Sequence, residues 1–152
     1  MRRRQRRQRI IVGMVVLLII GAGLLLVKQM GGHSARDVVV KFYKEEQGGD
    51  FGSAWKLFHP KMQEKFQKNA YVTERSHIYM GHYGVSTFDF KIKDRKKLKN
   101  WRMSPDGQSF ERVEKYTVQQ EFHSKFGVFT IVQEVFTVKE KGQWRILWEF
   151  RQ

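Results

Sequence analysis

Residues 50–60, DFGSAWKLFHP, are the stretch that decides the fold of this 152-residue chain. Its first residue, Asp50, is a preferred helix cap, and apolar residues follow it at spacings of three and four. These apolar residues are Phe51, Ala54, Trp55 and Phe58. The stretch therefore predicts a helix that begins after Asp50. Pro60 suits the start of a further helix, because proline has no N–H to leave unpaired, and His59 is expected to cap it.

The residues on either side extend the helical pattern. Ser34 and Asp37 have the Ser-x-x-acid spacing of a capping box, and the apolar residues that follow predict a helix from Ala35 to Gln47. Gly48-Gly49 would end this helix, so that it forms a hairpin with the helix after Asp50. Two more short helical segments are expected, at Lys61–Lys68, with Met62 and Phe66 facing inward, and at Thr73–Tyr79, closed by Gly81.

After Gly84 the apolar period changes from helical to two, which is typical of strands with one buried face. Strands are expected at 88–93, 95–103, 110–122, 126–138 and 144–151. Helices followed by long strands predict an α+β fold, in which a helical hairpin and short helices pack on a curved antiparallel sheet of four to five strands. Such a sheet tends to bend around a helix and leave a conical cavity.

The amino-terminal residues predict a membrane anchor. Residues 2–9 contain six arginines, and residues 10–27 carry no charge. A helix of 18 residues is about 27 Å long, close to the roughly 30 Å hydrocarbon core of a bilayer. Arginine clusters stay cytoplasmic, so the chain is predicted to cross the cell membrane once with its amino terminus inside. The predicted parts are a cytoplasmic basic segment (1–9), a transmembrane helix (10–28), a linker (29–33) and an extracytoplasmic domain (34–152).

Two other interpretations of the same segment fit its residues less well. A cleaved signal peptide has a shorter apolar region, and the small-x-small pattern at 33–35 begins with His33. An arginine-rich arm that binds nucleic acid would not need an apolar segment beside it, so membrane topology and anionic lipid explain the arginines better. The sequence therefore favours an uncleaved anchor and predicts no nucleic-acid partner.

Charge and cysteine content limit what the external domain can do. Residues 1–30 hold seven basic residues and no acid, which leaves 22 basic and 15 acidic residues, a net charge of +7, in the remainder. This charge favours an anionic neighbour such as phospholipid, although a merely soluble basic surface explains it equally well. The chain has no cysteine, so disulfides and thiolate metal sites are excluded.

Three stretches resemble one known superfamily. Phe42-Tyr43 lies on the first helix, residues 49–60 carry the turn into the second, and residues 144–149 form the closing strand. In these features the chain resembles the nuclear-transport-factor-2-like superfamily, the cystatin-like cone, with Asp50, Ala54 and Trp55 at the motif positions. It is closest to small domains found behind one transmembrane helix in Gram-positive bacteria, including amino-terminal domains of some penicillin-binding proteins. The resemblance implies the cone fold, but members range from enzymes to adaptors.

Candidate polar groups for the cone interior come from residues 77–82 and from the strands. His77 and His82 flank tyrosines, but a spacing of five sets two side chains about 140° apart on an α-helix, and Gly81 intervenes. Glu114 and Glu134 share strand parity with apolar neighbours, as do Arg112 and Gln120, and a buried carboxylate there would have a raised pKa and could act as a base. Solvent exposure and pairing across the sheet are the simpler explanations.

One stretch of the expected sheet is strongly basic and could contact an anionic surface. It consists of Lys91, Lys93, Arg95, Lys96, Lys97, Lys99 and Arg102, with Trp101 beside them. Lysines on an exposed edge strand also prevent aggregation between sheets, and this explanation is equally consistent with the sequence.

Two functional hypotheses follow. The first is a non-catalytic interaction module, tethered to the membrane, that holds another envelope protein; catalytic triads, phosphate-binding loops and zinc signatures are absent from the sequence, and no cofactor or metal is predicted. The sequence is also compatible with a homo-oligomer of this chain. The alternative is an enzyme of the isomerase or dehydratase type, or a binder of small molecules, that uses the cone cavity. An open interior would favour the alternative, and a filled one the interaction module.

Overall fold

The computed structural model describes residues 34–150. The predicted cytoplasmic segment (1–9), transmembrane helix (10–28) and linker (29–33) lie outside the described residues. Within 34–150, no helix has both the length and the apolar character needed to cross a bilayer.

The first half of the described chain is helical, as predicted. The helices are α2 (Ala35–Gln47), α3 (Phe51–Trp55), α4 (Pro60–Lys65), α5 (Lys68–Ser76) and the π-helix η1 (His77–Tyr83). The predicted caps are confirmed. Ser34 and Asp37 form the capping box of α2, the side chain of Asp50 accepts a hydrogen bond from the N–H of Ser53, and His59 Nδ1 accepts one from the N–H of Lys61.

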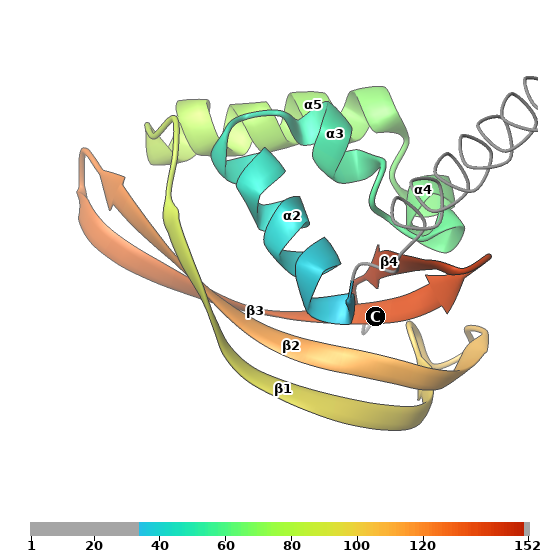
Figure 1. Ribbon diagram of the computed structural model, residues 1–152. Helices are drawn as coiled ribbons and strands as arrows, with labels where there is room; N and C mark the ends of the chain where they lie inside the picture. Colours follow the sequence, from blue (N-terminus) through green and yellow to red (C-terminus); the bar gives the residue numbers. More distant parts are fainter. Residues whose placement is uncertain (1–33, 151–152) are drawn as a thin grey trace, which may run out of the picture. The chain divides into compact units, whose positions relative to one another are not determined.

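The second half forms one antiparallel sheet in which neighbouring strands are also neighbours in sequence. Its order is β1 (Asp89–Arg102), β2 (Ser109–Ser124), β3 (Gly127–Glu140) and β4 (Gln143–Leu147). The sheet is curved, and the helices gather on its concave side, with α2 nearest to the strands (Figure 1). The predicted α+β class and curved antiparallel sheet are therefore confirmed, with four strands.

Several predicted boundaries were wrong because backbone pairing overrode the local pattern. The strands expected at 88–93 and 95–103 are one strand, β1, with a register shift between Ile92 and Asp94. The last strand stops at Leu147, because the N–H of Trp148 then points to Met62 Sδ and the N–H of Phe150 donates to the carbonyl of Met103.

The helical segment after α4 also differs from the prediction. It runs through α5 and η1 without a break, and Gly81 lies inside it. Gly84 ends it instead, in the left-handed conformation with φ of +65°, which favours glycine. Gly81 was expected to end the helix because glycine is a common terminator, but its φ is not positive.

Aromatic side chains fill the space between the helices and the sheet. The ring of Phe58 lies 5.2 Å from Phe42, 5.2 Å from Tyr71 and 4.9 Å from Trp148, centroid to centroid. Phe42 and Phe58 are fully buried. The contacts of Phe58 with Tyr71 and Trp148 are edge-to-face, and such aromatic pairs add to the free energy of burial. The interior is therefore a packed core in the part of the chain that the structure describes.

The carboxyl-terminal part of β3 is covered on both faces. Its residues from Val135 to Val138 are all buried, and the ring of Trp101 stacks on Phe136 with centroids 4.2 Å apart. This contact places the indole of Trp101 in the packing of the sheet.

Candidate functional site

A buried polar cluster, here called the Glu46 network, lies between the helices and the sheet. Glu46 on α2 is 1% exposed. Its Oε1 accepts hydrogen bonds from the Tyr71 hydroxyl and from Arg75 Nε, and its Oε2 accepts from Arg75 Nη2 and from the Tyr79 hydroxyl. Gln120 on β2 donates to the Tyr79 hydroxyl from 3.4 Å, which joins the sheet to the network.

Burial and the charge of Glu46 together keep Tyr71, Tyr79 and Arg75 protonated near neutral pH. Burial, and next the negative charge of Glu46, raise the pKa of Tyr71 and of Tyr79, so both hydroxyls stay protonated as donors. Burial alone would lower the pKa of Arg75, but the charge of Glu46 and their hydrogen bond outweigh it and raise the pKa. The network is therefore a charged pair with satisfied partners.

The Glu46 network has the composition of an acid/base site but not the geometry of one. Both carboxylate oxygens already accept two hydrogen bonds, which leaves no acceptor position for a substrate proton. Sequence reasoning looked for a buried carboxylate on the strands and missed this one on a helix. The signal was present, since Glu46 follows the buried residues Val39, Phe42 and Tyr43 at spacings of seven, four and three.

The two glutamates predicted for the interior lie elsewhere. Glu114 is half-buried and accepts hydrogen bonds from the Tyr116 hydroxyl at 2.6 Å and from Arg95 at 2.9 Å. Partial burial acts to raise the pKa of Glu114, but these hydrogen bonds outweigh it and hold the pKa below its usual value. Glu134 is exposed and pairs with Lys115. Glu114 therefore lacks the raised pKa of a buried base, and Glu134 lies outside the interior. Gln120 does reach the interior, at 2% exposed.

The structure brings His77 and His82 together, contrary to the expected angle of about 140°. Their ring centroids are 4.7 Å apart, with the ring planes at 84°. The prediction was wrong because it assumed an α-helix, and η1 is a π-helix, whose wider turn returns residue i+5 to the side of residue i. Both side chains are exposed, and no group of three or more potential metal-binding residues exists within 34–150.

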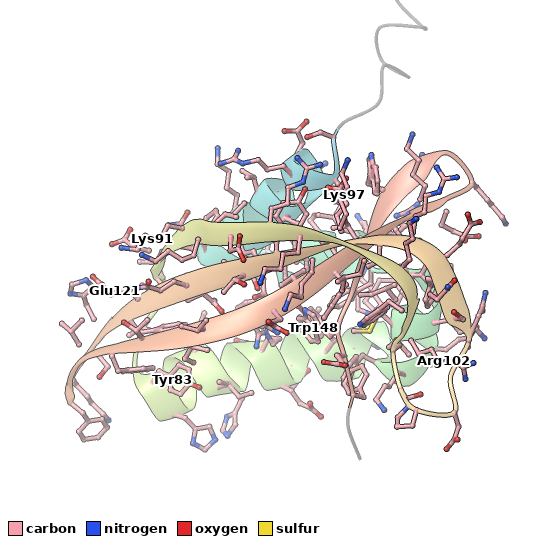
Figure 2. The ribbon with its side chains drawn as sticks, turned by 90° about the horizontal axis from the view of Figure 1, so that it is seen from below. Tyr83, Lys91, Lys97, Arg102, Glu121 and Trp148 are labelled. Carbon is pink, nitrogen blue, oxygen red and sulfur yellow. The ribbon has the colours of Figure 1, made fainter. Side chains whose placement is uncertain are left out.

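The predicted basic stretch follows one strand rather than forming a compact patch. Figure 2 shows Lys91, Lys97 and Arg102 spread along β1, which at about 3.3 Å per residue is more than 40 Å long. Arg95 and Lys96 form ion pairs with Glu114 and Asp94. The remaining basic side chains of the stretch, on Lys91, Lys93, Lys97, Lys99 and Arg102, are exposed. The only aromatic residue of the stretch, Trp101, packs on Phe136.

Hollows open on the surface, away from the Glu46 network. One of about 430 Å³ is lined by residues from the helical half and from the β3–β4 turn, among them Lys56, Pro60, Glu140 and Arg145. Another of about 240 Å³ is lined by residues 84–89 and His123. Both are wide open to solvent, unlike the enclosed apolar pockets that bury a small-molecule ligand.

Within residues 34–150, the sheet has two free edges. One is β1, and the other, here called the β3 edge, consists of residues 128–134 of β3. β4 pairs only with residues 136–140 of β3, so no strand within the described chain covers the residues before them. Exposed apolar side chains mark this region: Phe126 is 81%, Val128 61% and Val132 63% exposed. Residues 126–133 carry no charge.

The direction of the main-chain groups on this edge follows from the neighbouring hairpin. Glu140 and Gln143 flank a two-residue turn in which Lys141 and Gly142 both have positive φ, so even-numbered residues of β3 direct their N–H and C=O toward β4. The register between β2 and β3 is constant from end to end. Even-numbered residues from 128 to 134 therefore direct their main-chain groups outward, away from β2.

Comparison with known proteins assigns neither a family nor a function to this chain. No protein-family model matches the chain, and no curated protein matches it at a significant level.

Proposed function

We propose that this protein is a non-catalytic interaction module, anchored in the cell membrane by residues 10–28, whose extracytoplasmic domain binds another envelope protein by adding one of its strands to the β3 edge. The observation that carries the proposal is the contrast between a filled interior and a sheet edge that has outward main-chain groups and no charge before Glu134. Membership of the nuclear-transport-factor-2-like superfamily is part of the proposal and fits the curved sheet with helices on one face.

The filled interior is the first support. Aromatic side chains and the Glu46 network occupy the space in which a cone-type enzyme would hold its substrate. The alternative hypothesis, an isomerase, a dehydratase or a small-molecule binder, finds no support in this arrangement, because the buried carboxylate has no free acceptor position.

The two free edges of the sheet give the second support, because they are treated differently. β1 carries exposed lysines along its length, the usual protection against pairing with another sheet. The β3 edge has no such protection over residues 126–133. An open edge in a sheet whose opposite edge is protected suggests that pairing at the open edge is a function.

The chemistry of this edge specifies the partner as an extended strand. Four residues, Val128, Thr130, Val132 and Glu134, present main-chain donors and acceptors at intervals that only a β-strand matches. The exposed valines would pack against apolar side chains at alternate positions of that strand. The basic domain, with its net charge of +7 beyond residue 30, would favour acidic residues flanking it.

The test is site-specific photocrosslinking in cells that produce the full chain. A photoreactive amino acid at Val132 is expected to trap a specific envelope protein, whereas the same probe at Lys91, on the protected edge, is expected to trap none. If the probe at Val132 yields no specific product, the interaction module loses its basis.

Substitutions at Thr130 and Ile131 show whether main-chain hydrogen bonds of the β3 edge hold the partner. Thr130→Pro removes an outward N–H and is expected to abolish the Val132 crosslink while the domain stays folded. Thr130→Val keeps that N–H and should preserve the crosslink. Ile131→Pro would instead remove an N–H that faces β2 and is expected to unfold the sheet. A crosslink that survives Thr130→Pro would contradict strand addition.

A further inference from the structure

The π-helix η1 brings two imidazole rings to one exposed place on the surface. In an α-helix, residues five apart point about 140° away from each other, and no rotamer would let both side chains reach one small ligand. In η1 the ring centroids of His77 and His82 are 4.7 Å apart. A π-helix replaces the regular hydrogen bonds of an α-helix with bonds between residues five apart, and such segments occur often at functional sites.

We infer that His77 and His82 together bind a divalent transition-metal ion of the Zn²⁺, Ni²⁺ or Cu²⁺ class. A tetrahedral zinc ion holds imidazole nitrogens at about 2.0–2.1 Å, which sets the centroids of two bound rings about 5 Å apart. The observed separation of 4.7 Å is close to this value, and rotation of the two side chains would turn their edge-to-face rings so that one nitrogen of each points at the ion. Ring planes at 84° are compatible, because each ring turns about its own metal–nitrogen bond.

The surroundings of the two rings leave them able to bind. His59 uses both ring nitrogens, one with the N–H of Lys61 and one with Glu140, and His123 pairs with Glu121. Within residues 34–150, His77 and His82 have no such hydrogen bond or ion pair, only their contact with each other. The core does not need either ring, since both side chains are exposed.

Gly81 sets the position of one ring. A Cβ atom at this position would lie 3.2 Å from His77 Nδ1 and 3.3 Å from its Cε1, closer than ordinary contact. The absence of a side chain at Gly81 therefore lets the imidazole of His77 lie against the η1 backbone and beside His82.

The protein supplies only part of the coordination sphere. No third His, Asp or Glu joins the pair within the described residues, so water would complete the coordination of the ion. Borderline cations prefer imidazole, whereas Mg²⁺ and Ca²⁺ prefer oxygen, so the site is expected to discriminate between these classes.

The experiment is calorimetric titration of the full chain, in detergent and without a polyhistidine tag, with Zn²⁺ and with Mg²⁺. Zinc is expected to bind with one ion per chain, and magnesium is not. His77→Ala and His82→Ala should each weaken zinc binding about tenfold or more, because the second ligand no longer acts at high effective concentration. His123→Ala, which removes another exposed histidine, is the matched control and should leave the affinity unchanged.

Two further measurements fix the ligands. Gly81→Ala should displace the His77 ring and weaken zinc binding, with the helix content unchanged by circular dichroism. Cu²⁺ added to the native chain should give a spin-resonance spectrum with two coupled nitrogens. Equal zinc affinity in the native chain and in both histidine variants would overturn the inference, as would a loss in only one of them.

Discussion

At the scale of single residues, the buried carboxylate of Glu46 connects several elements of the interior. Glu46 lies on the buried side of α2, and four hydrogen bonds from three side chains converge on its carboxylate. Replacing one member of a buried ion pair leaves the other without compensation, which costs more than the net contribution of the pair. The network therefore ties α2 to α5 and η1, and through Gln120 to β2.

Glu46→Gln is expected to lower the free energy of unfolding by about 3 kcal/mol or more, because the guanidinium of Arg75 would lose its counter-charge in a largely buried position. Urea unfolding followed by tryptophan fluorescence measures the change. Glu45→Gln, one position away and partly exposed, is the control and should have little effect. A small effect of Glu46→Gln would show that water reaches Arg75.

His59 makes the stability of the domain sensitive to mild acid. Burial, which outweighs the nearby Glu140, lowers its pKa from the usual 6.5. The unfolded chain therefore takes up a proton at higher pH than the folded chain does. Stability is fully present above about pH 6.5 and is expected to fall as the pH drops through that value toward the folded-state pKa.

The variant His59→Gln tests this dependence. Its free energy of unfolding should change less between pH 7.5 and pH 5.5 than that of the native chain, as measured by urea unfolding at both values. His123→Gln, at an exposed position, is the control. If native and His59→Gln chains lose stability equally over this range, other groups cause the acid sensitivity.

At the scale of elements, the ends of the helices depend on single residues. Gly84 adopts a φ of +65°, where a side chain is strained, and the N–H of Gly84 closes η1 on the carbonyl of Tyr79. This turn directs the chain from the helical half into β1.

Gly84→Ala is expected to destabilise the domain by about 1 kcal/mol, since alanine does not readily adopt positive φ. Thermal unfolding by circular dichroism measures the loss. Gly52→Ala is the matched control, because a Cβ at this helical position would meet Asp50 Oδ1 and Lys68 Cε at an ordinary 3.6 Å. The control should be neutral or slightly stabilising, and equal effects of both variants would contradict the conformational argument.

Elements also show how far local pattern reaches. The helix from Ala35 to Gln47 was predicted with both of its ends, because caps and apolar spacing act within a few residues. The π-helix was not predicted, because nothing in the local pattern around Gly81 distinguishes it from an α-helix. The consequence was a wrong angle for His77 and His82.

At the scale of the whole molecule, the proposal requires residues 34–152 to lie outside the cell. The chain has no cysteine, so a single introduced cysteine reports its own location. Lys141→Cys, at an exposed turn, is expected to react with a membrane-impermeant maleimide on intact cells. Gln5→Cys, among the arginines, should react only after lysis. Labelling of Lys141→Cys only after lysis would contradict the proposed topology.

The sequence by itself determined the order of helices and strands, the caps at Ser34, Asp50 and His59, and the absence of disulfides. These features depend on residue types and on neighbours within about four positions, which the sequence shows directly. It also placed the charge-free segment after the arginines, on which the proposed anchor rests.

Tertiary structure alone decided which polar residues are buried, which histidines meet and which sheet edge is open. Glu46 reaches Arg75 across 29 positions, and the short β4 leaves the outer edge of β3 without a partner strand before Phe136. Such contacts depend on how distant segments pack and on where pairing stops, because the free energy of burying a charge or leaving an edge open is set by the partner and not by the residue itself.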